Sequence, residues 1–116
     1  MYNYKLLDPE RCAFFEIGPE QELPSGERIF VELDEKDIVI FNVAGAYYAI
    51  ADICSHDDGP LGDGELYGTE VACPRHGAHF DLETGKALSL PAVEDIPSYP
   101  VRIVNGKIQI GIPVDE

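Results

Sequence analysis

Two short clusters of metal-ligand residues constrain this chain more than any other feature. The first contains Cys54 and His56, the second contains Cys73 and His76, and sixteen residues separate them. Two thiolates and two imidazoles could hold one zinc ion, or a 2Fe-2S cluster with cysteine on one iron and histidine on the other. The cluster takes one cysteine and one histidine from each loop. The order Cys, His, Cys, His therefore predicts a metal site built from two loops.

The residues around these ligands resemble the cluster-binding loops of Rieske ferredoxins. The first loop reads C-S-H-D-D-G-P-L from residue 54, and the second reads C-P-R-H-G-A-H-F-D from residue 73. The resemblance covers roughly residues 43–112, and Pro91-Ala92 is similar to the third, proline-bearing loop of the family. The family implies a Rieske-type 2Fe-2S cluster.

The resemblance also implies a role for each ligand. Cys54 and Cys73 would bind one iron through sulfur, and His56 and His76 would bind the other through Nδ1. Neutral imidazoles add no negative charge, so such a cluster is easier to reduce than one held by four thiolates. The family further implies a one-electron carrier, not an enzyme, that takes electrons from a flavoprotein reductase. It passes them to the terminal Rieske oxygenase of an aromatic-ring dioxygenase system.

The second loop also predicts where the reduction potential falls. High-potential relatives have a serine and a tyrosine in the pattern H-G-S-H-Y, where residues 76–80 here contain Ala78 and Phe80. Those relatives also join their loops by a disulfide whose cysteines would fall at Gly59 and Arg75. Without the two hydroxyl donors, we expect a potential near the lower limit of the range for Rieske centres, about −150 mV.

Other interpretations of the cysteines and histidines remain. A zinc-stapled interaction module would use the same four ligands, and a Cys54–Cys73 disulfide would use two of them. Within the redox class, the chain could be the small subunit of a nitrite reductase or a ferredoxin associated with iron–sulfur assembly. We expect His79 to be a surface or packing residue, and Cys12 to be a buried, reduced thiol in an N-terminal strand.

Composition limits the partners. The chain of 116 residues fits a single domain, residues 1–116, and carries 22 acidic against 8 basic residues, a net charge of −14. Such a field disfavours nucleic acid and anionic membranes but suits a partner with a basic docking face. The N-terminus has no secretory pattern, and no apolar run approaches the ~20 residues of a membrane span. We therefore expect a soluble, monomeric, cytoplasmic protein.

The rest of the chain predicts an all-β fold. Apolar runs separated by glycine, proline and asparagine turns indicate strands, and no helical periodicity is sustained over three turns. Asn105-Gly106 is a strong hairpin signal. We expect a small antiparallel barrel or sandwich with an inserted cluster-binding subdomain at about residues 52–91. The expected strands are residues 27–33, 38–43, 47–50, 99–104 and 107–112.

Overall fold

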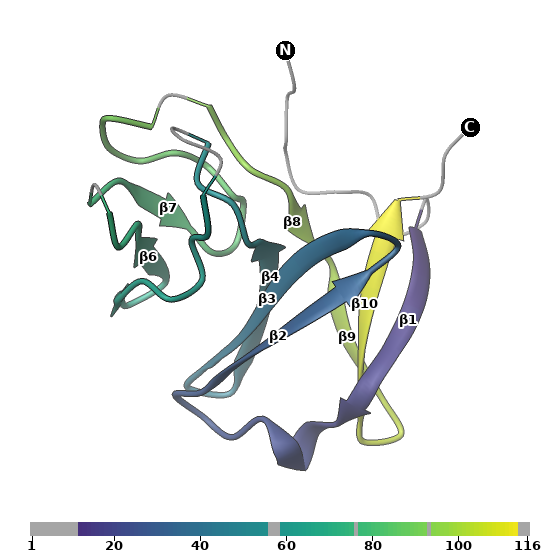
Figure 1. Ribbon diagram of the computed structural model, residues 1–116. Coiled ribbons are helices and arrows are strands. Elements are labelled where there is room, and N and C mark those ends of the chain that lie inside the picture. Colours follow the sequence, from purple (N-terminus) through teal and green to yellow (C-terminus); the bar gives the residue numbers. More distant parts are fainter. Residues whose placement is uncertain (1–11, 56–58, 76, 93, 114–116) are drawn as a thin grey trace.

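The computed structural model describes residues 12–55, 59–75, 77–92 and 94–113 (Figure 1). Its described residues form ten strands and one short 3₁₀ helix, which confirms the predicted all-β class. The elements are β1 (Cys12–Pro19), η2 (Glu20–Glu22), β2 (Arg28–Leu33), β3 (Lys36–Val43), β4 (Ala46–Ala51), β5 (Leu66–Tyr67), β6 (Glu70–Ala72), β7 (His79–Asp81), β8 (Ser98–Tyr99), β9 (Val101–Val104) and β10 (Lys107–Pro113).

Three antiparallel sheets divide these strands. One has the order β2-β3-β4-β8, the second has the order β1-β10-β9, and the small third sheet has the order β5-β6-β7. The first two sheets enclose an aliphatic core that includes Ile40 and Ile110. The small sheet lies to one side in Figure 1, in the stretch of chain between β4 and β8.

Strand β3 is buried on both of its faces, and its sequence shows why. Ile38 and Ile40 face the core between the two larger sheets, whereas Val39 and Phe41 belong to a second core. The second core also contains side chains from the small sheet, such as Phe80. Residues on alternate sides of a strand are normally apolar and polar, so an unbroken apolar run indicates burial on both sides.

Three hairpins connect strands that follow one another in the chain: β2 and β3, β3 and β4, and β9 and β10. Asp34 and Glu35, Ala44 and Gly45, and Asn105 and Gly106 each form a two-residue hairpin turn with positive φ at both positions. Paired positive φ values fit the right-handed twist of the flanking strands. The hairpin turn predicted at Asn105-Gly106 is therefore confirmed.

The single strand predicted over residues 99–104 is wrong, because the chain changes sheets within it. β8 pairs with β4 and β9 pairs with β10, and Pro100 lies between them. Proline has no amide hydrogen to donate to a ladder, so a strand is readily interrupted there. The Pro100 carbonyl still accepts a hydrogen bond from Gly111 at 2.8 Å.

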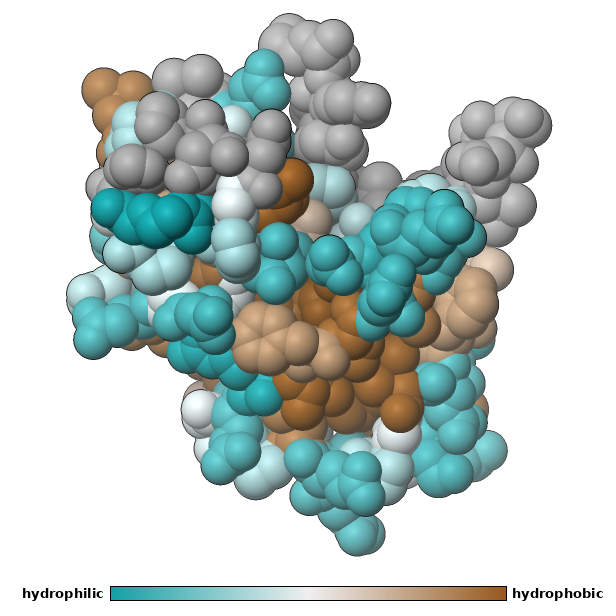
Figure 2. All heavy atoms as spheres, in the orientation of Figure 1, coloured by the Kyte–Doolittle hydropathy of each residue, from teal (hydrophilic) through white to brown (hydrophobic). Residues whose placement is uncertain are grey.

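Strands β1 and β2 are edges of their respective sheets, and apolar surface lies between them. A hollow of about 90 Å³ at this seam is lined by residues that include Ile17, Leu23 and Ile29. Figure 2 shows this apolar region bordered by hydrophilic side chains. At the start of β1, Cys12 is half-buried, so its predicted burial is wrong, whereas its predicted place in an N-terminal strand is confirmed.

Candidate metal centre

The first loop leaves β4 and immediately buries a thiol. Cys54 has no exposed surface, and its amide donates to the Gly59 carbonyl at 2.7 Å. This bond closes the loop on itself and satisfies the amide of a buried residue, which otherwise carries a desolvation cost. The neighbouring Ser55 hydroxyl donates to the carbonyl of Glu94 at 2.5 Å. The first loop therefore contacts the segment that follows Pro91-Ala92, as expected for a third loop beside the site.

Two charged side chains, Arg28 in β2 and Asp52 immediately after β4, hold the end of this loop. One carboxylate oxygen of Asp52 accepts hydrogen bonds from the amides of Leu61 at 2.9 Å and Gly62 at 2.6 Å. From β2, the Arg28 guanidinium donates to the carbonyls of Gly62 and Gly64, the latter at 2.7 Å. Hydrogen bonds with charged partners are stronger than neutral ones. The loop is thus attached to the sheet through both its amides and its carbonyls.

Close contacts explain two glycines of this segment, Gly64 against backbone and Gly62 against side chains. A Cβ atom at Gly64 would lie 1.7 Å from the carbonyl oxygen of Ala72, and one at Gly62 would lie 2.6 Å from the Phe30 ring. Backbone atoms cannot yield as a flexible side chain can, so Gly64 is the more restrictive position. This contact brings the first loop against the residue that precedes Cys73.

The second loop is a tight turn that begins at another buried thiol. Cys73 is 2% exposed; its amide donates to the Ala78 carbonyl at 2.7 Å, and its carbonyl accepts from Gly77 at 2.8 Å. Gly77 has φ of +75°, a conformation that other residues adopt only with strain. The turn holds the Cys73 backbone in place between β6 and β7.

Both cysteines belong to one buried hydrophobic core, which also contains Ala78 and Phe80. Neither cysteine forms a disulfide, so the Cys54–Cys73 bridge considered from the sequence is wrong. Buried thiols on two hydrogen-bonded loops suit iron–sulfur ligation, because thiolates are the usual protein ligands of such clusters.

The other residues that the sequence singled out differ in how they lie relative to this hydrophobic core. His56 and His76 lie outside the described residues. Ala78 and Phe80 are fully buried and belong to the same hydrophobic core as the cysteines. Gly59 and Arg75, which the resemblance pairs in high-potential relatives, lie in contact.

An acidic groove borders the second loop. It has a volume of about 350 Å³, and its lining includes Asp63, Glu65, Tyr67, Cys73 and Pro74. Asp63 and Glu65 are both exposed, so acidic side chains reach the surface beside the candidate ligand Cys73.

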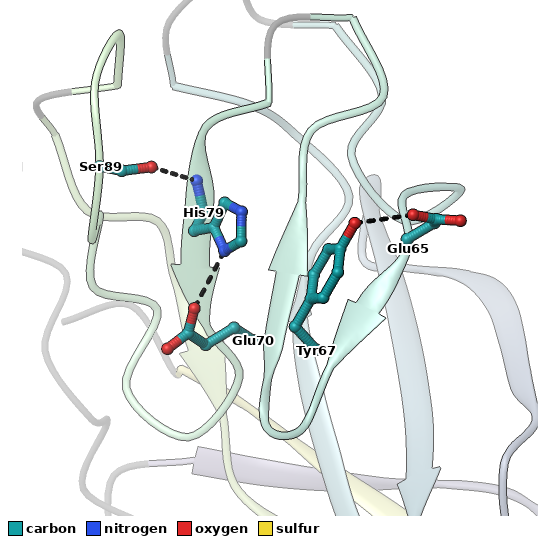
Figure 3. Close-up of polar contacts among 5 residues, drawn as sticks. All are labelled: Glu65, Tyr67, Glu70, His79 and Ser89. Atoms are coloured by element: carbon teal, nitrogen blue, oxygen red, sulfur yellow. Dashed lines mark hydrogen bonds and ion pairs between the residues drawn. The ribbon is translucent and has the colours of Figure 1, made fainter.

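Tyr67 and His79 form an ordered pair beside this groove (Figure 3). Their rings stack with centroids 5.2 Å apart, and His79 Nδ1 lies 3.0 Å from a Glu70 carboxylate oxygen. The Tyr67 hydroxyl donates to Glu65 at 2.7 Å; this bond and the charge of Glu65 raise the pKa of Tyr67 above 10.0. His79 is half-buried and stacks on Tyr67, which agrees with the expectation of a surface or packing residue.

Sequence reasoning missed Arg28 and Asp52, the two side chains that attach the first loop to the sheet. Asp52 lies two residues before Cys54, which is a weak local signal. Arg28 is separated from the carbonyls it binds by 34 and 36 residues, so no spacing rule could have found it.

Comparison with known proteins identifies the class. The sequence profile of the Rieske [2Fe-2S] domain matches residues 13–100. The chain therefore belongs to the Rieske [2Fe-2S] domain family, and its cofactor is one Rieske-type 2Fe-2S cluster. The predicted 2Fe-2S cofactor is confirmed at the level of the family, and the zinc alternative is wrong.

Individual relatives are ferredoxins. The chain is 42% identical over 96 residues to the 3-phenylpropionate/cinnamic acid dioxygenase ferredoxin subunit of Escherichia coli K12, covering 82% of this chain and 90% of the relative. It is 38% identical over 89 residues to the ferredoxin component of the naphthalene 1,2-dioxygenase/salicylate 5-hydroxylase systems of a Ralstonia species, covering 77% and 86%. The solved ferredoxin of Sphingomonas yanoikuyae B1 has a TM-score of 0.78 and 30% identity, covering 87% of this chain and 100% of that one.

Within the described ranges, no helix has the length and apolar character that a membrane crossing needs.

Proposed function

We propose that the chain is a one-electron carrier in which Cys54 and Cys73 bind one iron and His56 and His76 bind the other. The observation that carries this proposal is the pair of buried, non-disulfide thiols on two hydrogen-bonded loops. When bound, the cluster supplies reversible one-electron chemistry. The loop contacts limit movement of the ligands between redox states, because Asp52 and Arg28 fix the backbone of the first loop.

The named relatives support a place in an aromatic-ring dioxygenase system. Their names describe ferredoxin components of dioxygenases that act on naphthalene or phenylpropionate. By analogy, this chain accepts electrons from a flavoprotein reductase and delivers them to a terminal oxygenase. The proposal places the protein in the cytoplasm, where thiols remain reduced.

Charge supports a partner with a basic docking face. The chain has a net charge of −14, and Asp63 and Glu65 are exposed beside Cys73. Opposite charge accelerates encounter without requiring a long-lived complex, which suits a carrier that must leave each partner.

Anaerobic spectroscopy tests the carrier proposal first. The purified protein should be brown, contain two irons and two sulfides per chain, and lose its visible bands on reduction by dithionite. Cys54→Ser should remove the cluster, whereas Cys12→Ser should retain it, because Cys12 lies in β1 outside the two loops. A colourless protein, or two irons in the Cys54→Ser variant, would contradict the ligand assignment.

Reconstitution then tests the partners. Reduction by a dioxygenase-type flavoprotein reductase should slow as salt rises beyond ~0.1 M, where the Debye length falls below about 10 Å. Reduced protein should support turnover of a terminal aromatic-ring oxygenase. A cluster-loaded protein that fails with oxygenases but supports a nitrite reductase would favour that alternative.

A further inference from the structure

Arg75, in the second loop, lies directly against the backbone of the first loop. A Cβ atom built at Gly59 would lie 2.7 Å from the guanidinium carbon and 2.7 Å from one terminal nitrogen of Arg75. The guanidinium therefore occupies the space beside Gly59 that any other residue would need for its side chain. Gly59 has no left-handed φ, so its small size, not its backbone freedom, is what this contact uses.

A hydrogen bond completes this contact. Arg75 Nη1 donates to the carbonyl of Pro60 at 2.6 Å. The bond joins a residue two positions after Cys73 to the segment whose Gly59 carbonyl accepts from the Cys54 amide. One side chain thus connects the backbones of both loops that carry the candidate thiolate ligands.

We propose that Arg75 is a positioning residue, which fixes the separation of the two cluster loops by packing on Gly59 and bonding to Pro60. A planar guanidinium can stack over a peptide and donate at its edge simultaneously, whereas a lysine ammonium can do only the second. The role differs from a general charge effect, because it depends on Gly59 as much as on Arg75. It rests on the proposed ligand assignment.

A double-mutant cycle on the cluster-loaded protein separates these roles. Arg75→Gln removes the guanidinium, and Gly59→Ala displaces it without changing the charge of the chain. Arg102→Gln is the matched control. Arg102 is exposed and lies in the β1-β10-β9 sheet, where it stacks on Phe14 and bonds to Gln109. The readouts are the rate of bleaching by an iron chelator, deuterium uptake of the first loop, and the EPR line shape of the reduced cluster.

We expect Arg75→Gln and Gly59→Ala each to accelerate bleaching about fivefold, the rate equivalent of one hydrogen bond worth ~1 kcal/mol. The double variant should bleach no faster than either single variant, because both remove the same contact. Both single variants should also speed exchange of the Cys54 amide and broaden the EPR lines, and the Arg102→Gln protein should match the wild type.

Three outcomes would overturn the proposal. One is an Arg75→Gln protein that behaves like Arg102→Gln in all readouts. Another is a double variant whose acceleration is the product of the two single effects, since that marks independent contacts. The third is unchanged EPR line shape in both single variants. A wild-type protein without a cluster would instead contradict the ligand assignment, so the two failures are distinguishable.

Discussion

Replacing Asp52 by alanine should loosen the first loop, because the half-buried Asp52 side chain holds the end of that loop. One oxygen of its carboxylate accepts from two amides, those of Leu61 and Gly62. Hydrogen bonds to charged groups contribute about 1.5–3 kcal/mol each, and the half-buried position favours the lower value, so we expect a loss of roughly 3 kcal/mol. With an unfolding entropy of about 2.1 cal/mol/K per residue, this corresponds to a fall in Tm of about 12 °C.

Thermal unfolding of the cluster-loaded protein, followed by circular dichroism at a fixed scan rate, measures this effect. Asp52→Asn keeps a carbonyl oxygen for the same amides but loses the charge, so its Tm should fall by about half as much. Asp63→Ala is the control, because it removes an exposed carboxylate from the same loop. A decrease of less than about 3 °C for Asp52→Ala would refute the reasoning, since the amides would then be satisfied without the carboxylate.

Three further predictions concern the cluster environment. The double variant Ala78→Ser, Phe80→Tyr should raise the midpoint potential by about 40 mV for each new hydrogen bond to sulfur worth ~1 kcal/mol, and an unchanged voltammogram would show that neither hydroxyl reaches sulfur. Tyr67 should ionise above pH 10.0 and keep its bond to Glu65 until the pH passes the raised pKa of Tyr67. Glu65→Gln should lower this pKa in an ultraviolet titration of tyrosine ionisation, and the Tyr67→Phe variant shows which part of the absorbance change belongs to Tyr67. Cys73→Ser should lose iron and sulfide together, and analysis that still finds two irons per chain would exclude Cys73 as a ligand.

The type of metal centre and the local geometry of the hairpins could be predicted from the sequence. Positive φ at Asn105-Gly106 and Ala44-Gly45 depends on residues in the turn itself. Similarly, Ile108 and Ile110 alternate with polar residues along β10, and that pattern determines which face is buried. Each of the two candidate ligand cysteines lies within three residues of a histidine, and the order of these two pairs can be seen directly in the sequence. The type of metal centre was therefore also predictable.

Only the tertiary structure decided how the loops are held. The Arg28 contacts with Gly62 and Gly64 span 34 and 36 residues, and the Arg75 bond to Pro60 joins two different loops. No periodicity or motif specifies such contacts. They exist because the sheets bring separate segments together.

The same reason explains the incorrect strand and the second core. A run of apolar residues in β3 indicated burial, but not that the small sheet would cover its outer face at Val39 and Phe41. The sequence indicated one strand running through Pro100, and it did not show that the chain would pass from one sheet to the other there. Local sequence determines the backbone conformations and the polarity of each segment. Several arrangements of the segments satisfy these local preferences, and the one that buries the most apolar surface between distant segments is favoured.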